Sequence, residues 1–182
     1  MRIISGKYKG RRFDLPKTFK ARPTTDFAKE NLFNVLNNTV DWEGAQALDL
    51  FGGTGSISLE FVSRGCRPVI CVEKDPLNFS HIRKLKTELK ADELTVLNMD
   101  VFKYIGICRE KFDIIFADPP YDLKFLPDVP RLVLEKGLLK ENGVFVMEHS
   151  RNNNFSDLPL FVEQRIYGSV NFSIFINTEE TR

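Results

Sequence analysis

The chain has 182 residues, of which 42% are hydrophobic and 28% charged, with a formal net charge of +1. This length suits one domain with a full core, and the 16 phenylalanines need an interior, which excludes disorder over most of the chain. The longest apolar runs, such as residues 69–72 and 144–147, are far shorter than the roughly 20 residues of a membrane-spanning helix, and no apolar region typical of a signal peptide follows Arg2.

The charge is unevenly distributed at the start of the chain. Residues 1–22 carry eight lysines and arginines against one aspartate, a net of +7, whereas residues 23–182 carry −6. The alternating pattern of residues 3–15 around Gly6 and Gly10 predicts a small β-hairpin that displays the basic side chains. We therefore divide the chain into a basic N-terminal hairpin extension, residues 1–22, and one domain, residues 23–182. Such asymmetry favours a polyanion-binding face, and a solvated basic tail is the alternative.

Strands and helices alternate in the rest of the chain. A helical period predicts a first helix at residues 25–38. Five short apolar runs are typical of strands that are buried on both faces. These runs are residues 45–51, 68–73, 94–99, 112–117 and 143–148. The helices predicted between them are residues 56–64, 75–89, 100–108 and 130–136. We expect Ser56 to cap the first of these, and Asp75 with Pro76 to open the second.

This alternation predicts an α/β fold with a doubly wound parallel sheet. Two more strands, residues 161–167 and 170–177, are joined at Gly168-Ser169 and predict a terminal hairpin. The ligand site of such a sheet lies beyond the carboxyl ends of its strands.

A glycine-rich loop follows the first predicted strand. Gly52, Gly53 and Gly55 allow a tight turn and a close approach of the backbone to a ligand. The loop does not match a dinucleotide fingerprint, because Ser58 stands where the third glycine or alanine is needed. It is not a phosphate-binding P-loop either, because no Gly-Lys-Ser/Thr follows.

Acidic residues end three successive strands. Asp49 precedes the glycine loop, where it would repel a pyrophosphate and suit a cationic amino-acid group such as the methionine part of S-adenosylmethionine. Glu73 ends the second strand and can accept hydrogen bonds from both hydroxyls of a ribose. Asp100 follows the third strand, where it can accept from an adenine amino group or simply cap the next helix. Together these acids favour S-adenosylmethionine as the cofactor, with S-adenosylhomocysteine as its product.

The fourth strand ends in Asp118-Pro119-Pro120-Tyr121. The two prolines remove two N–H donors and stiffen the segment, which leaves the Asp118 carboxylate and the Pro119 carbonyl as acceptors. Tyr121 offers a flat face for stacking. The set fits a planar base with an exocyclic amine, because acceptors on its N–H groups return the lone pair to nitrogen and stabilise the positive charge that develops during attack. A proline-rich turn that merely ends a strand is the alternative.

The cysteines and histidines indicate no metal site. Cys66, Cys71 and Cys108 are odd in number and lack zinc-ligand spacing, and they favour a reducing, cytoplasmic setting. His81 and His149 have no partner pattern around them, so we expect a surface or structural role for each.

These motifs resemble class I S-adenosylmethionine-dependent methyltransferases that modify exocyclic amines of bases. The closer resemblance is to the RsmD-type bacterial enzymes, which methylate guanine N2 in 16S ribosomal RNA. It is carried by Arg2-Ile3-Ile4-Ser5-Gly6, Gly10-Arg11, Arg22-Pro23-Thr24-Thr25-Asp26, Asp49-Leu50-Phe51 and Gly53-Thr54-Gly55, as well as by Glu73 and the tetrapeptide at 118–121.

The resemblance implies a Rossmann-like, mostly parallel seven-stranded sheet with helices on both faces and an antiparallel last hairpin. It implies cofactor contacts from Asp49, Glu73, Asp100, the loop glycines, Val101 and Thr24, and catalysis by Asp118, Pro119, Pro120 and Tyr121. We expect Lys7, Lys9, Arg11, Arg12 and Arg22 to hold RNA phosphates. The implied enzyme is a cytoplasmic monomer that acts on 16S ribosomal RNA, within the small ribosomal subunit, without a membrane or a metal.

Three other readings stay open at this point. The tetrapeptide equally allows a DNA adenine-N6 or other nucleic-acid amine methyltransferase, although 182 residues leave little room for a target-recognition domain. An RNA-binding protein without activity would predict a damaged loop or tetrapeptide. A nicotinamide enzyme is opposed by Asp49 and Ser58.

Overall fold

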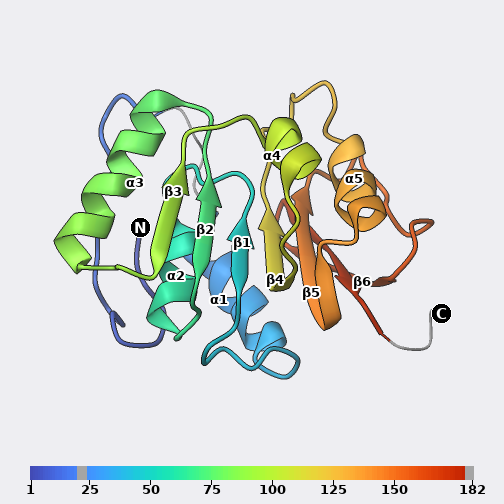
Figure 1. The fold of residues 1–182 in the computed structure, drawn as a ribbon, viewed down its shortest axis with the longest axis horizontal. Helices are drawn as coiled ribbons and strands as arrows, with labels where there is room; N and C mark the ends of the chain where they lie inside the picture. The colour runs from blue at the N-terminus through green and yellow to red at the C-terminus, as the bar shows by residue number, and fades with distance from the viewer. Residues whose placement is uncertain (20–23, 179–182) are drawn as a thin grey trace.

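The fold is organised around one seven-stranded sheet. The computed structural model describes residues 1–19 and 24–178. The strands are β1 (Ala47–Asp49), β2 (Val69–Val72), β3 (Leu94–Leu97), β4 (Phe112–Ala117), β5 (Leu139–His149), β6 (Phe161–Tyr167) and β7 (Val170–Ile176). Their order across the sheet is β3-β2-β1-β4-β5-β7-β6 (Figure 1). β1 to β5 are mutually parallel, whereas β7 is antiparallel to both β5 and β6, which confirms the predicted fold class.

Helices cover both faces of the sheet. They are α1 (Asp26–Leu36), α2 (Ser56–Ser63), α3 (Pro76–Leu89), α4 (Val101–Ile107) and α5 (Asp128–Lys136). The apolar side chains of α1, α2 and α3 share one core layer, and those of α4 and α5 share the other. Successive strand residues therefore bury alternate side chains on opposite faces, with Ala47 in the first layer and Leu48 in the second.

The helix starts confirm the predicted cap of α3 and correct that of α2. Thr25 caps α1 by accepting from the Ala28 amide, and the Asp75 carboxylate caps α3, with Pro76 in its first turn. The prediction that Ser56 caps α2 is wrong. The cap is Gly55, whose left-handed φ of 82° ends the tight loop and leaves Ser56 as the first helical residue.

β5 is longer than predicted. It begins at Leu139 rather than at residue 143, because Leu139 pairs with Phe112 across an irregularity before regular pairing starts at Ile114 and Val144.

The N-terminal segment turns back on itself. The Ile3 amide donates to Arg11 O at 3.0 Å and the Gly10 amide donates to Ile3 O at 2.9 Å, while Arg2 and Arg12 form an isolated antiparallel bridge. The predicted hairpin is thus present as a turn with one bridge rather than as two regular strands. Ile3 is 1% exposed and packs in the first core layer. The division of the chain at residue 22 remains a prediction.

A buried charge ties this segment to α1 and α2. Lys29 and Glu60 have fully buried side chains, 3.9 Å apart between Nζ and Oε1. The Lys29 ammonium also donates to Arg2 O at 3.0 Å and to Ser56 Oγ at 2.9 Å, and Glu60 accepts from the Ile4 amide at 2.9 Å. Burial lowers the pKa of Lys29, so its charge depends on these partners.

The length and composition of the helices show whether any of them could cross a membrane. In the described ranges, no helix combines the length and the apolar character that a bilayer crossing requires.

The two glycines of the N-terminal turn give a test of its packing. Gly6 and Gly10 both have left-handed φ values, 87° and 84°, but an added Cβ would lie 1.8 Å from Ser63 O at Gly6 and would meet nothing within 4 Å at Gly10. Gly10→Ala should therefore cost only backbone strain, about 1–2 kcal/mol. Gly6→Ala should cost at least about 2 kcal/mol more, because the turn must leave α2. Equilibrium denaturant unfolding measures both losses, and equal losses would contradict the observed packing.

Candidate active site

A cavity of about 950 Å³ lies at the carboxyl ends of the parallel strands. The segments that follow β1, β2, β3 and β4 line it, together with Glu148 of β5, the start of α1 and the β6–β7 turn. Ten of the predicted cofactor-binding and catalytic residues take part in its wall: Thr24, Gly52, Gly53, Glu73, Asp100, Val101, Asp118, Pro119, Pro120 and Tyr121. The structure thus brings together residues that lie almost 100 positions apart in the sequence.

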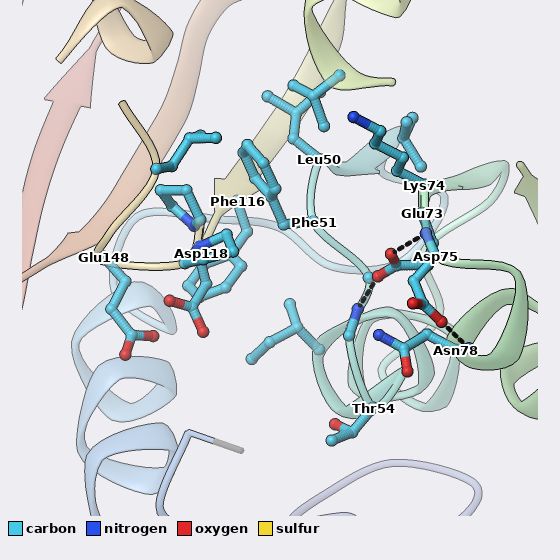
Figure 2. Close-up of a pocket in the computed structure, with 18 of the residues that line it drawn as sticks. Leu50, Phe51, Thr54, Glu73, Lys74, Asp75, Asn78, Phe116, Asp118 and Glu148 are labelled. Carbon is cyan, nitrogen blue, oxygen red and sulfur yellow. Dashed lines mark hydrogen bonds between the residues drawn. The ribbon is translucent and has the colours of Figure 1, made fainter. Parts of the chain in front are cut away.

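Glu73 fixes the glycine loop at one end of the cavity. Its carboxylate accepts from the Gly53 amide at 2.6 Å and from the Asp75 amide at 2.8 Å (Figure 2). Gly53 has a left-handed φ of 55°, and a Cβ there would approach only Phe51 O, at 3.9 Å, so it would project into open space. Burial raises the pKa of Glu73. Each carboxylate oxygen keeps a lone pair for a further donor, such as a ribose hydroxyl.

Asp49 lies beneath the loop and does not line the cavity. It is 1% exposed, and Ser58 Oγ donates to its Oδ2 at 2.7 Å. Its Oδ1 is buried without a hydrogen-bond partner in the part of the chain that the structure describes. Burial raises the pKa of Asp49 to about 7. Gly55 also lies outside the cavity wall, so direct cofactor contact by these two residues remains a prediction.

Asp100 caps helix α4, one of the two roles predicted for it, and it also lines the cavity. Its Oδ1 accepts from the amides of Phe102 and Lys103 at 2.9 and 3.2 Å, which starts α4. Its Oδ2 lies 3.6 Å from the ammonium of Lys74. Since this ion pair is largely exposed, we expect it to be weak and exchangeable for an amino group of a ligand.

The other end of the cavity contains a pair of carboxyl groups, Asp118 and Glu148. Ala117 pairs with Met147 in the parallel register of β4 and β5, so the two next residues lie side by side. Glu148 accepts from Thr24 Oγ1 at 3.0 Å and from the Tyr121 hydroxyl at 3.1 Å. In Figure 2, both carboxyl groups lie across the cavity from Glu73 and Asp75.

Each of these carboxyl groups affects the ionisation of the other. Burial raises the pKa of Asp118 well above its usual range, and the hydrogen-bonded Glu148 carboxyl raises it further. Burial raises the pKa of Glu148 as well, against the hydrogen bonds from Thr24, Tyr121 and Asp118, which lower it. Two like charges in contact cannot both ionise without a large free-energy cost, so the pair titrates as a unit.

Glu148 is the site residue that sequence reasoning missed. The signal was available, since an acid lies close to the carboxyl end of the fifth parallel strand, as in the other four. Its partner in the neighbouring strand could not be assigned before the register was known.

The predicted RNA-binding residues do not gather at the cavity. The Lys7 ammonium pairs with Glu93 at 2.5 Å. Because Glu93 precedes the first residue of β3, this pair lies at the amino edge of the sheet, opposite the cavity. Lys9, Arg11 and Arg12 are exposed, and Arg22 lies outside the described residues.

His149 and the cysteines have structural surroundings. His149 is buried, with Nε2 2.7 Å from Ser173 Oγ and Nδ1 2.7 Å from Ser150 O, which ties β5 to β7. The three cysteines are free and buried. Within residues 1–19 and 24–178, no three His, Cys, Asp or Glu side chains form a group that could hold a metal ion.

The fold and the site define a Rossmann-like methyltransferase, and comparisons with known proteins agree. The profile of the family described as Conserved hypothetical protein 95 matches residues 1–176. The chain is 37% identical over 158 residues to the putative rRNA methyltransferase YlbH of Bacillus subtilis, with 83% of each chain covered. It is 28% identical over 178 residues to ribosomal RNA small subunit methyltransferase D of Escherichia coli K12, covering 96% of this chain and 89% of that one.

A solved structure supports the same conclusion. The putative methyltransferase yhhF from Escherichia coli superposes with a TM-score of 0.85 at 27% identity, with 98% of both chains covered. The chain therefore belongs to the Conserved hypothetical protein 95 family, the RsmD-type methyltransferases, and the resemblance in its sequence is confirmed.

The buried Asp49 predicts a pH-dependent stability. Its pKa rises from an ordinary 3.8 to about 7 on folding, so the folded state binds the proton more tightly, and the resulting stability is lost as pH rises from about 4 to about 7. This loss amounts to about 4 kcal/mol at most. We expect Asp49→Asn to remove most of it, so that the variant gains stability relative to the wild type at pH 8 but not at pH 4.

Thermal unfolding across this pH range is the measurement, and Asp92→Asn, at an exposed acid, is the matched control. A constant difference between Asp49→Asn and the wild type at all pH values would show that Asp49 is ionised throughout.

Proposed function

We propose that this chain transfers a methyl group from S-adenosylmethionine to the exocyclic N2 amine of a guanine in 16S ribosomal RNA. The family relatives named as rRNA methyltransferases support the coarser part of this proposal. The finer part is supported by one observation: Asp118, Pro119 and Glu148 line the same cavity as Glu73, with the two acids Asp118 and Glu148 across it from Glu73.

The charge of the cavity fits this cofactor. Among the described lining residues, six are acidic and one is a lysine: Glu73, Asp75, Asp100, Asp118, Asp122 and Glu148, with Lys74. Such a wall favours a ligand with a sulfonium and an ammonium group and opposes a pyrophosphate. Its volume suits a nucleoside-sized ligand together with an acceptor base. The same charge argues against a nicotinamide dinucleotide.

Glu73 would hold the ribose hydroxyls, Asp100 the adenine amino group, and the amides and carbonyls of the glycine loop the methionine end. When bound, the cofactor supplies an electrophilic methyl group on a positively charged sulfur.

The residues of the tetrapeptide act on the acceptor amine. The Asp118 carboxylate and the Pro119 carbonyl accept its two N–H groups, which directs the nitrogen lone pair toward the methyl group. As the N–C bond formed, the S–C bond of the cofactor would break and leave the thioether S-adenosylhomocysteine, so positive charge would pass from sulfur to nitrogen. The Asp118–Glu148 pair would stabilise this charge and take up the proton that the product releases. Tyr121 is 45% exposed and offers its ring to the base.

We further propose how the RNA binds. The target guanine leaves its stack to enter the cavity. Lys9, Arg11, Arg12 and Arg22 of the N-terminal extension, residues 1–22, hold phosphates of the RNA, so binding weakens with salt. The small ribosomal subunit is the acceptor particle, and the enzyme acts as a monomer.

Methyl transfer from labelled S-adenosylmethionine tests the proposal, with unmethylated small ribosomal subunits, naked ribosomal RNA and duplex DNA as acceptors. After digestion, we expect the label in N2-methylguanosine from ribosomal material. Label in DNA adenine would keep the Asp118 chemistry and overturn the substrate. No label in any acceptor, despite measurable cofactor binding, would overturn the proposed activity.

The matched variant in this assay is Asp118→Ala. It should lower kcat by about 10²–10³-fold, the effect of removing one group that stabilises transition-state charge, while cofactor binding is retained. Unchanged turnover would show that Asp118 is not part of the chemistry.

A further inference from the structure

Glu148 has unused capacity to accept hydrogen bonds. A carboxylate can accept about four hydrogen bonds. Glu148 accepts one from the Thr24 hydroxyl and one from the Tyr121 hydroxyl. Its carboxyl group also interacts with that of Asp118, whose pKa it raises. Among the described residues, neither Glu148 nor Asp118 is within ion-pair distance of a lysine or arginine. Within residues 1–19 and 24–178, the pair therefore presents acceptor oxygens that no lysine or arginine contacts.

The position of Glu148 places this capacity where an acceptor base would lie. Glu148 is 4% exposed, yet it lines the cavity together with Asp118, Pro119 and Tyr121. Asp118 and Glu148 directly follow the paired residues Ala117 and Met147, so two acidic side chains lie next to each other in the cavity wall. This arrangement matches a ligand edge that carries two adjacent, nearly parallel N–H donors.

We propose that Glu148 is the specificity-determining residue of the site and accepts the N1–H of the target guanine while Asp118 and Pro119 accept the N2 hydrogens. This inference rests on the proposed function and deepens it. It assigns the choice of base, which the tetrapeptide alone leaves open, to a residue on the neighbouring strand.

The donor pattern of the bases explains the choice. The Watson–Crick edge of guanine places the N1–H donor beside the N2 amine. In adenine and cytosine the ring nitrogen beside the amine has a lone pair and no hydrogen, so it would face the Glu148 carboxylate as acceptor against acceptor. A buried acceptor left without its donor costs more than a missing contact, which makes such an edge discriminating.

A purely structural role for Glu148 is the competing explanation. Through its two hydrogen bonds it could simply hold Thr24 and Tyr121 in place. The two roles differ in their response to the base, because a structural role affects all acceptor bases alike.

The experiment compares two acceptors that share the N2 amine and differ at N1. Small ribosomal subunits are assembled with 16S rRNA that carries at the target position either guanine or 2-aminopurine, whose N1 has a lone pair. The wild type should methylate guanine about 10- to 100-fold faster, the range expected for one hydrogen bond to a charged group. In Glu148→Gln the side-chain amide can donate to N1 of 2-aminopurine, so the preference should shrink by at least about tenfold or reverse.

Two controls separate this account from a structural effect. Tyr121→Phe removes one hydrogen bond to Glu148 but keeps its carboxylate, so the preference for guanine should persist even if the rate falls. Equilibrium binding of both RNAs in the presence of S-adenosylhomocysteine, without turnover, should show the same shift for Glu148→Gln.

Equal methylation of both acceptors by the wild type would overturn the inference, as would an unchanged preference in Glu148→Gln. Neither result would affect the proposed function as long as guanine is methylated. Failure of the wild type to methylate guanine at all would instead overturn the proposed function.

Discussion

The crowding of carboxyl groups at one edge of the sheet determines the properties of this protein. Parallel strands end side by side, and in this chain an acid lies close to the carboxyl end of each of β1 to β5. Burial raises the pKa of four of these acids: Asp49, Glu73, Asp118 and Glu148. Such an edge can be stable only if hydrogen-bond donors or protons compensate the charge.

The chain itself supplies some of these donors. The Gly53 amide donates a hydrogen bond to Glu73, and the Ser58 hydroxyl donates to Asp49. The Thr24 and Tyr121 hydroxyls donate to Glu148. The carboxyl oxygens that remain without a donor need protons or ligands. A cationic cofactor at one end and an amine-bearing base at the other are the kinds of ligand that meet this need. Carboxyl groups without a donor lower the stability of the folded protein, and the same groups are available to bind a ligand.

Much of the fold and of the cavity could be predicted from the sequence. Short, continuously apolar runs identified all five parallel strands, because strands covered on both faces cannot alternate. The ends of those strands then indicated Glu73, Asp100 and the 118–121 tetrapeptide, which line one cavity. The cap of α2 was assigned wrongly, because the left-handed Gly55 determines where that helix begins and Ser56 is merely a good capping residue by type.

Features that depend on pairing across the sheet escaped prediction. Glu148 matters because of its register with β4, and a single strand does not reveal its neighbour. The position of Lys7 depends on how the N-terminal turn packs on Ser63 and Glu93, which are far away in sequence. Charge clustering in sequence therefore indicated a basic segment but not the edge of the sheet at which it lies.

The coupled ionisation of Asp118 and Glu148 is the most direct test of this account. The measurement is a carboxyl ¹³C NMR titration of the protein, with Glu148→Gln used to assign the resonances. We expect one of the two groups to remain protonated at neutral pH, and the remaining Asp118 resonance to titrate at lower pH in Glu148→Gln. Two independent titrations near the ordinary pKa values of 3.8 and 4.5 would contradict the account.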